Sequence, residues 1–333
     1  MIIILIYHTI VSKKLVSDLN DRNKDLPPFE VLDMISTLDA NKAVGPDIIS
    51  NKMFIAVTVH ISKPLCMLFN KSLHHNIFQT DWKLANAIPL FTAGDKSFPS
   101  NDRPIPLLSC VSKLLEKIVS KHIFNHSKGN KLLCKFQSGC LPGCSTTHQL
   151  VVLYHRILLA LDRKQCTRIS KAFDTVLIKV FLLKLERYGI GDNLPIWFKS
   201  YLSNGTQRVV IKDALSNISQ LKAWVPQGSV LGPLLFLVFI NAIVDGMSGL
   251  GRLFADDTSI GHIANDKDSL QNMVNLDLAY LKDWSKRWLV KFNQNKTEIM
   301  VFCARETKLY FNFDFEGASL RDVELHKQLG VIF

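Results

Sequence analysis

The sequence of 333 residues lacks an apolar run of about 20 residues, the length that a helix needs to span a bilayer. The apolar start at residues 1–7 is too short, and the stretch 230–240 contains Gly232 and Pro233, which favours a buried helix. Residues 1–7 also lack a preceding basic residue and a clear cleavage site, so no signal peptide is predicted. Internal repeats, low-complexity runs and obvious linkers are absent too. We therefore expect one large domain or two closely packed ones, neither secreted nor membrane-bound.

Cysteine is sparse, and its pattern does not suggest pairing. The seven cysteines are odd in number and irregular in spacing, which favours an intracellular, reducing compartment (nuclear or cytoplasmic) over a disulfide framework. Cys140, Cys144 and His148 lie four residues apart, as metal ligands on a helix do. Because Pro142 and Gly143 interrupt a helix between the first two, a zinc site is not predicted.

Basic residues outnumber acidic residues in this chain. Lys and Arg number 40 against 29 Asp and Glu, for a net charge of +11. This surplus favours a polyanionic partner such as nucleic acid. Lys113, Lys117 and Lys121 fall four residues apart on a predicted helix and would form one basic stripe. A merely basic protein with solvated helix faces has the same features, so charge alone leaves both interpretations open.

Two adjacent aspartates, Asp256 and Asp257, interrupt the otherwise apolar stretch 253–260. Neighbouring carboxylates repel each other and are costly to desolvate. A strand–turn–strand with apolar arms can present such a pair at its tip. Divalent cations would then neutralise the pair, and two such cations are the machinery of nucleotidyl transfer. The alternative is a polar hairpin turn without a metal.

Other segments place this pair in a wider pattern. They are Asn-Asp-Arg-Pro-Ile at 101–105, Ser-Lys-Ala-Phe-Asp at 170–174, Trp-Val-Pro-Gln-Gly-Ser-Val-Leu-Gly-Pro at 224–233, Asn-Gln-Asn-Lys-Thr at 293–297 and Leu-Gly-Val at 329–331. Together with the aspartate pair, and in this order, they resemble the reverse transcriptase of non-LTR (LINE-type, jockey/CR1-like) retrotransposons. The resemblance runs from about residue 29 to the C-terminus.

Hydrophobic periodicity predicts the individual elements. We expect helices over residues 29–38, 51–75 with a break at Pro64, 111–125, 148–162, 176–188, 194–202 and 268–288, and strands over 82–90, 207–211, 218–225, 298–303 and 308–315. The last helix would bury Leu270, Val274, Leu281, Trp284 and Trp288. Helices on an antiparallel sheet make the fold class α+β.

The resemblance implies the fingers and palm of a right-hand polymerase. Residues 1–28 would be an N-terminal extension and 29–165 a fingers-like region. Residues 166–333 would form the palm, with a helical insertion at about 176–203 and an end before the thumb. The partners implied are an RNA template, a DNA primer and dNTPs.

The resemblance also assigns roles to single residues. Asp256 and Asp257 would be catalytic and would bind Mg²⁺ or Mn²⁺ as cofactor. The nucleotide would be bound by Arg103, Phe173, Gln227, Gly228 and Lys296. Within that set, the aromatic Phe173 would reject the ribose 2′-hydroxyl, and Lys296 would contact the triphosphate.

One part of the family pattern is missing. The third metal-binding carboxylate belongs five residues before Phe173, where this chain has Arg168. No apolar run separates residue 162 from residue 170, so we predict that a short deletion removed both a strand and its aspartate. Asp162 and Asp174 lie nearby but not at the metal-binding position. We therefore predict little or no polymerase activity. The alternative function is that of a non-catalytic remnant that binds nucleic acid.

Overall fold

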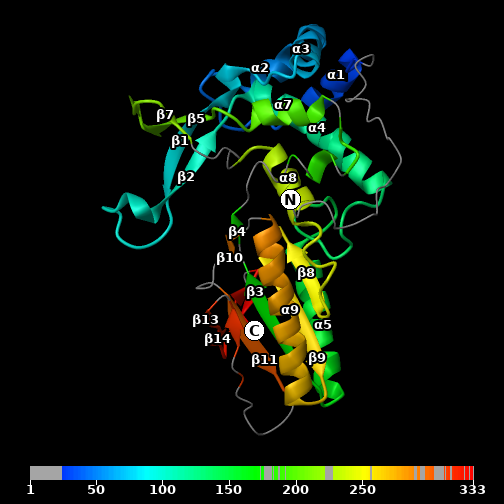
Figure 1. Cartoon of the computed structure of the whole chain (residues 1–333). Helices are drawn as coiled ribbons and strands as arrows, with labels where there is room; N and C mark the ends of the chain where they lie inside the picture. The colour runs from blue at the N-terminus through cyan, green and yellow to red at the C-terminus, as the bar shows by residue number, and fades with distance from the viewer. Residues whose placement is uncertain are drawn as a thin grey trace. The chain divides into compact units, whose positions relative to one another are not determined.

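The computed structural model describes most of the chain after residue 24 (Figure 1). The described residues are 25–172, 174–175, 182, 184–186, 188–191, 193–221, 228–255, 257–288, 291–292, 297–303, 311, 313–315, 317–325, 327–329 and 331–332. For residues 166–172, 174–175, 291, 314, 321–322 and 327–328 the description covers the backbone alone.

The chain forms two compact units, each of which joins two separate segments. The first unit comprises Met1–Leu132 and Leu182–Leu235, and the second comprises Leu133–Phe181 and Phe236–Phe333. The sequence predicts a boundary between the fingers-like region and the palm near residue 165, whereas these units interleave along the chain.

The first unit contains a group of helices from both of its segments. They are α1 (Pro28–Ser36), α2 (Asn51–Ala56), α3 (Thr58–His74), α4 (Cys110–Gly129) and α7 (Leu194–Tyr201). Pro28 occupies the first turn of α1, where a missing N–H costs nothing, and Val31 and Ile35 are buried on its inner side. The helices predicted from periodicity over 29–38, 111–125 and 194–202 are confirmed, and α4 extends four residues beyond its predicted end.

The predicted break at Pro64 is wrong. The chain breaks at Val57 instead, whose backbone (φ −119°, ψ 23°) separates α2 from α3. There the Thr58 hydroxyl donates to the carbonyl oxygens of Phe54 at 3.1 Å and Ile55 at 2.8 Å, which competes with continuous helix. Pro64 lies inside α3, where the burial of residues such as Phe69 outweighs the lost backbone hydrogen bond.

A small sheet completes the first unit. Its strands are β1 (Leu84–Phe91), β2 (Asp102–Leu107), β5 (Thr206–Ile211), β6 (Ala214–Leu215) and β7 (Ser219–Gln220), with short 3-10 turns at Thr80–Lys83 and Pro99–Asn101. β1 pairs antiparallel with β2 and parallel with β5, and β5 pairs antiparallel with β6 and β7. The predicted pairing of 207–211 with the segment after 218 is confirmed over the described residues.

Aromatic side chains tie the two segments of this unit together. The Phe78 ring lies edge-on to Trp82 at 5.3 Å, to Trp197 at 5.5 Å and to Tyr201 at 4.9 Å. Trp197 and Tyr201, on α7, stack with their ring centroids 5.7 Å apart. Such pairs add to the free energy gained from burial. They explain why residues 182–235 belong with the first unit although they follow residue 165.

The second unit is built on an antiparallel sheet with one parallel edge pair. Its strand order is β14-β11-β3-β9-β8, formed by Arg321–Asp322, Glu298–Phe302, Cys166–Ala172, Asp257–Ala264 and Leu250–Phe254. Helix α9 (Lys267–Trp288) packs on the face that carries Ala264, and α5 (Thr146–Asp162) packs through Leu153 and Ile157 on Phe302 of the other face (Figure 1).

Four of the five residues predicted for the apolar face of α9 are fully buried. These are Leu270, Val274, Leu281 and Trp284, and Trp288 is half-buried. Asp277, on the same helix, accepts hydrogen bonds from the backbone N–H of Ser248 at 2.8 Å and of Gly249 at 2.9 Å. It also pairs with His262 of β9 at 2.9 Å, which fastens the start of β8 to the sheet.

Helix α8 (Leu231–Ile240) is buried nearly all round, as the run 230–240 predicts. Shorter strand pairs are β4 (Asp174–Thr175) with β10 (Lys291–Phe292), β12 (Asp314–Phe315) with β13 (Ala318–Ser319), and β15 (Lys327–Gln328) with β16 (Val331–Ile332). Most of the helix predicted over 176–188 and half of the strand predicted over 308–315 lie outside the described residues. The mixture of helices and sheets confirms the α+β class. In the described part of the chain, no helix combines the length and the apolar character that crossing a bilayer requires.

The strand that the sequence predicted to be deleted is present. Cys166–Ala172 forms β3, the central strand of the second unit, with β9 on one side and β11 on the other. The prediction relied on the lack of a continuous apolar run. Thr167 and Ile169 are β-branched residues that favour extended structure, and two flanking strands supply hydrogen bonds to the backbone. Pairing within the sheet therefore outweighs the polar composition.

Candidate functional site

Asp257 lies at the tip of a β-hairpin, where the sequence predicts the aspartate pair. β8 and β9 pair antiparallel up to Phe254 and Asp257. Ala255 has φ of +52°, the left-handed conformation that such hairpin turns require and that residues with a side chain rarely adopt. Asp257 is half-buried, and Asp256 lies outside the described residues.

A buried glutamine supports this turn from behind. The Gln137 side chain is 5% exposed, and its Oε1 accepts hydrogen bonds from the N–H of Ala255 at 3.2 Å and of Gly139 at 2.8 Å. The neighbouring backbone adds two more bonds, because Ser138 N–H donates to the Leu253 carbonyl at 2.8 Å and Leu253 N–H donates to the carbonyl of residue 136 at 3.1 Å. Sequence reasoning missed this support.

Gly139 allows the segment to approach the turn. A Cβ atom there would lie 2.0 Å from the backbone nitrogen of Ala255 and 2.6 Å from the carbonyl carbon of Phe254. Real Cβ atoms do not come that close to backbone, so this position requires glycine. The hydrogen bonds of Gln137 and the close packing of Gly139 together fix the turn in one conformation.

The pairing of β3 with β9 shows which residues of β3 lie near the aspartate hairpin. Ala172 pairs with Thr258, whereas Arg168 pairs with His262, five residues along β9 from Asp257. At about 3.4 Å per residue, position 168 is roughly 17 Å from the end of the hairpin. None of residues 166–172 is Asp or Glu. The sheet therefore offers no third carboxylate from β3.

The two nearby aspartates are held in other elements. Asp174 belongs to β4, where it pairs with Phe292 of β10 rather than with the aspartate hairpin. Asp162 is the last residue of α5 and is exposed. Magnesium prefers a few carboxylate oxygens together with water and phosphate. The donor set on the hairpin and β3 is thus smaller than the three carboxylates that the family pattern implies, and it does not fit a complete two-metal site.

Two predicted nucleotide-binding residues lie in the first unit. Arg103 is exposed on β2 opposite Leu90 of β1. Gly228 is exposed, with φ of +88°, and a Cβ atom there would lie 3.5 Å from the carbonyl oxygen of Pro106 on β2. Its left-handed backbone favours glycine just before the start of α8. Phe173, Gln227 and Lys296 lie outside the described residues.

A buried carboxylate holds the chain directly after Gly228. Glu116 on α4 is 1% exposed, and its Oε2 accepts hydrogen bonds from the N–H of Val230 at 2.8 Å and of Leu231 at 3.3 Å. The Tyr201 hydroxyl donates to the same oxygen at 3.3 Å. Burial outweighs these three bonds and raises the pKa of Glu116 to about 7. Glu116 thus caps the first turn of α8. No motif in the sequence indicates it.

Metal ligands do not gather elsewhere in the part of the chain that the structure describes. Among those residues, no three His, Cys, Asp or Glu side chains lie close enough to hold a metal ion. Cys66, Cys110, Cys134, Cys140 and Cys144 are free thiols, and Cys303 is disulfide-bonded. The odd count and irregular spacing of the cysteines gave no signal for that bond.

Comparison with known proteins decides the family. A model of the family described as "Reverse transcriptase (RNA-dependent DNA polymerase)" matches residues 94–333, which is more than half of the chain. The chain belongs to the reverse transcriptase family. The predicted motifs from Arg103 to Lys296 and the aspartate hairpin all fall within the matched range.

Relatives among curated proteins come from insect mobile elements. The chain is 29% identical over 323 residues to "Probable RNA-directed DNA polymerase from transposon BS" of Drosophila melanogaster, which covers 91% of this chain and 35% of that protein. It is 28% identical over 318 residues to "RNA-directed DNA polymerase from mobile element jockey" of the same species, with 91% and 34% covered. The chain spans about a third of the length of these relatives. They confirm the predicted resemblance to non-LTR retrotransposon polymerases.

Proposed function

We propose that this reverse transcriptase domain binds a primed RNA template and is severely impaired in DNA synthesis. The observation that carries the proposal is the aspartate hairpin beside a β3 strand that has no carboxylate. In this proposal the second unit is the palm, because it contains the hairpin on an antiparallel sheet backed by α9. The first unit contains the β1–β2 strands with Arg103 and corresponds to the fingers.

Binding of nucleotide and metal follows the family pattern in this proposal. Asp256 and Asp257 hold Mg²⁺ or Mn²⁺. The dNTP is held by Arg103, Phe173, Gln227, Gly228 and Lys296. The exposed positions of Arg103 and Gly228 and the left-handed backbone of Gly228 support these roles, since a glycine lets the backbone approach a nucleotide.

Catalysis is impaired in the proposal because the metal site lacks a ligand. Two metal ions stabilise the attacking and the leaving oxygen only if the protein fixes their positions. Position 168, where the family carries its carboxylate, holds arginine and lies about 17 Å from the hairpin end along β9. A substitution at that position alone would therefore not repair the site.

A second candidate function is that of a non-catalytic protein that binds nucleic acid. The net charge of +11 favours it, because phosphate contacts do not need the metal site. Both functions predict RNA binding, and they differ only in whether any metal-dependent extension remains.

The binding part is tested by titrating a labelled primed RNA into the chain at several salt concentrations. With four or more phosphate contacts, we expect the affinity to fall at least about 50-fold between about 50 and 200 mM salt. The measurement is fluorescence anisotropy, with an uncharged peptide nucleic acid of the same sequence as control. Failure to bind the RNA at low salt would contradict the proposal.

A further inference from the structure

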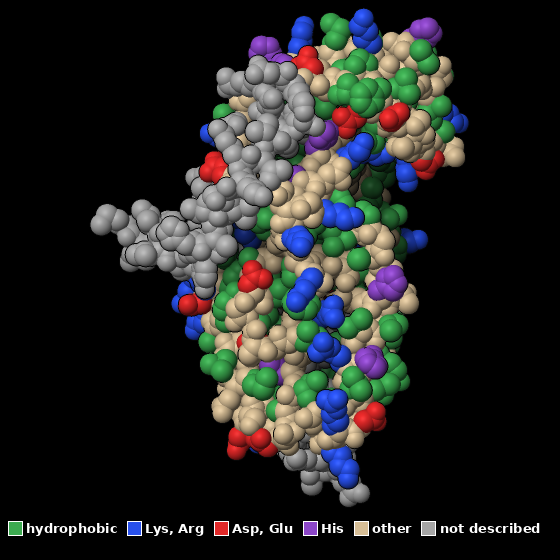
Figure 2. Space-filling view, turned by 90° about the vertical axis from the view of Figure 1, so that its right-hand side faces the viewer, with side chains coloured by type: hydrophobic (Ala, Val, Ile, Leu, Met, Phe, Trp, Pro, Cys, Tyr) green, Lys and Arg blue, Asp and Glu red, His purple; other side chains and the backbone are tan. Residues whose placement is uncertain are grey.

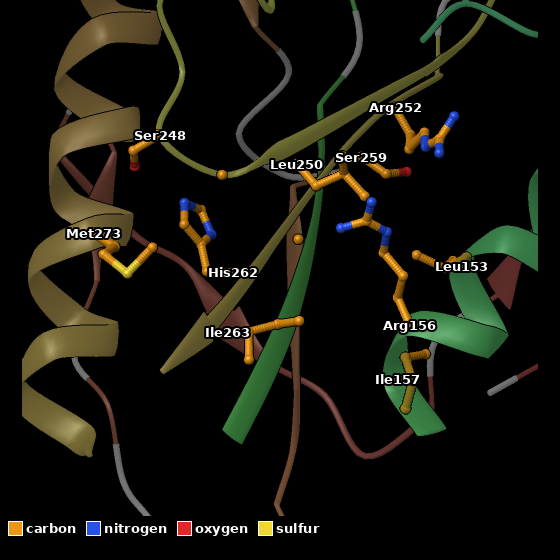
Figure 3. A pocket seen from close by; sticks show the side chains of 12 residues that line it. Leu153, Arg156, Ile157, Ser248, Leu250, Arg252, Ser259, His262, Ile263 and Met273 are labelled. Carbon is orange, nitrogen blue, oxygen red and sulfur yellow. The ribbon is translucent and has the colours of Figure 1, made fainter. Parts of the chain in front are cut away.

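A pocket of about 180 Å³ opens at the edge strand β8 of the second unit, and its lining comes from β8, β9, α5 and Met273 of α9. Figure 3 shows that Arg156 of α5 and Arg252 of β8 enter it from different sides, with the Ser259 hydroxyl next to Arg252. The residues that line it include no aspartate and no glutamate. The lining therefore carries positive charge without a carboxylate of its own, and Asp277, which is not part of the lining, is already paired with His262.

Neither arginine is neutralised within the described part of the chain. The ion pairs found there involve other side chains. The Nε atom of Arg252 is buried and makes no hydrogen bond. Burial, and then the charge of Arg156, lower the pKa of Arg252 from its usual value. Two guanidinium groups held near each other without an anion are costly, so the arrangement favours a bound anion.

The surroundings hold the Arg252 guanidinium in place. Its Cζ lies 5.5 Å from the centre of the Phe136 ring, and the Lys135 Nζ lies 5.0 Å from the same centre. A cation above an aromatic face is stabilised by the ring and keeps its charge. Phe136 directly precedes Gln137, so the segment that supports the aspartate turn also positions this arginine. Guanidinium forks match the oxygens of a phosphate group in geometry as well as charge.

Basic residues continue from the pocket along α5. Arg163 and Lys164 follow the end of this helix and are exposed. Figure 2 shows Lys and Arg side chains in a row on the face of the second unit that carries α5 and β8. Arg163 stands seven residues after Arg156, about 10 Å along the helix. That distance matches roughly three phosphates at about 3.4 Å of axial rise per nucleotide in one strand. A polymer fits this row better than a single free anion.

We propose that Arg156 and Arg252 each hold a backbone phosphate of a nucleic-acid strand that runs along α5 towards Arg163. This inference rests on the proposed function and adds a binding site to it. The site lies outside the aspartate hairpin and binds phosphodiester rather than triphosphate. It requires no metal ion, so it operates whether or not DNA synthesis occurs.

The test uses the full chain, the labelled primed RNA and the double variant R156Q/R252Q. We expect the slope of log affinity against log salt to become shallower by about 1.4 to 1.8, the value for two lost phosphate contacts. The matched control is K282Q/K286Q, which removes two exposed charges from α9 on the other face of the sheet and should leave the slope unchanged. Thermal unfolding of each variant shows that it is folded.

Each outcome decides a different point. If the unchanged chain does not bind RNA, the proposed function fails. If it binds, but the double variant and the control show equal slopes, the phosphate site is wrong and the proposed function stands. If inorganic phosphate protects the chain from unfolding through these arginines while the RNA slope is unchanged, the pocket holds a free anion and the polymer proposal is overturned. Should the double variant fail to fold, R156Q alone serves instead, because Arg156 is exposed. The slope of log affinity against log salt should then become shallower by about 0.7 to 0.9, the value for one lost phosphate contact.

Discussion

Primer extension by this chain should be at least about 10²- to 10³-fold slower than by the corresponding segment of the jockey RNA-directed DNA polymerase, with Mg²⁺ or Mn²⁺ present. Removing a single preorganised electrostatic group from an active site already costs that much, and a lost metal ligand costs no less. The comparison uses matching segments because this chain spans only 34% of that relative. The measurement is nucleotide incorporation on a primed RNA template under single-turnover conditions.

The structural reason for this slow extension is the composition of β3. The strand runs beside β9 with Ala172 opposite Thr258, so its backbone reaches the level of the hairpin. What it fails to supply is a carboxylate, since residues 166–172 contain none. The fold that would present a third ligand is thus retained, and the ligand itself is absent.

The control for residual activity is D257N, which removes one of the two hairpin aspartates. If the hairpin is already inactive, D257N should leave the slow background rate unchanged. Extension by the unchanged chain at a rate within tenfold of the jockey segment, abolished by D257N, would contradict the account and show that another group completes the site.

Replacing Glu116 by alanine should destabilise the first unit by on the order of 3 kcal/mol or more. The substitution leaves the N–H groups of Val230 and Leu231 and the Tyr201 hydroxyl without their acceptor. Each buried polar group left without a partner lowers the free energy of unfolding by about 1–3 kcal/mol. Denaturant unfolding followed by tryptophan fluorescence measures the change, since Trp197 lies on α7 next to Tyr201 in the same unit.

Glutamine at this position separates the titration of Glu116 from the loss of its acceptor oxygen. The pKa of Glu116 is raised from 4.5 to about 7 on folding, so the folded state holds the proton more tightly than the unfolded state does. Its contribution to stability is complete below about pH 4.5 and is lost as the pH rises through 7. The uncharged E116Q variant keeps an acceptor oxygen and does not titrate. Relative to the unchanged chain, it should therefore gain on the order of 3 kcal/mol of stability between about pH 5 and pH 8.

The difference between the two proteins isolates this single group, because all other titrating residues are common to both. The tyrosine partner provides a further control: Y201F retains the carboxyl group and should retain most of the pH dependence. A stability difference between E116Q and the unchanged chain that is constant from pH 5 to pH 8 would show that Glu116 does not titrate in this range.

The hydrophobic pattern of the sequence predicts those helices and hairpins whose formation depends on neighbouring residues alone. The amphipathic spacing of Leu270, Val274, Leu281 and Trp284 predicts α9 and its buried side, because a helix must bury one face. The apolar arms around Asp256 and Asp257 predict the hairpin for a similar reason. The order of the motifs predicts the family, which the comparisons confirm.

Long-range pairing explains the errors. β3 exists because β9 and β11 lie on both sides of it, which no property of residues 166–172 reveals. Pro64 stays within α3 because burial of that helix outweighs one lost hydrogen bond. Gln137 and Glu116 act on residues more than 100 positions away, on Ala255 and Val230, so their roles become visible only in three dimensions. The interleaved units arise in the same way, through the contacts of α7 with Phe78.

Manganese binding by two matched variants tests the central claim most directly. K171D and R168D each replace a cation on β3 by aspartate. Position 171 pairs with Ser259, which is two residues from Asp257. Position 168 pairs with His262, which is five residues from Asp257. Residues two apart on a strand share a face, so a carboxylate at position 171 can join Asp257. In calorimetric titrations we expect K171D to bind Mn²⁺ at least about tenfold more tightly than R168D, with the gain abolished by D257N. Equal affinities in the two variants would contradict a metal site that lacks only its ligand from β3.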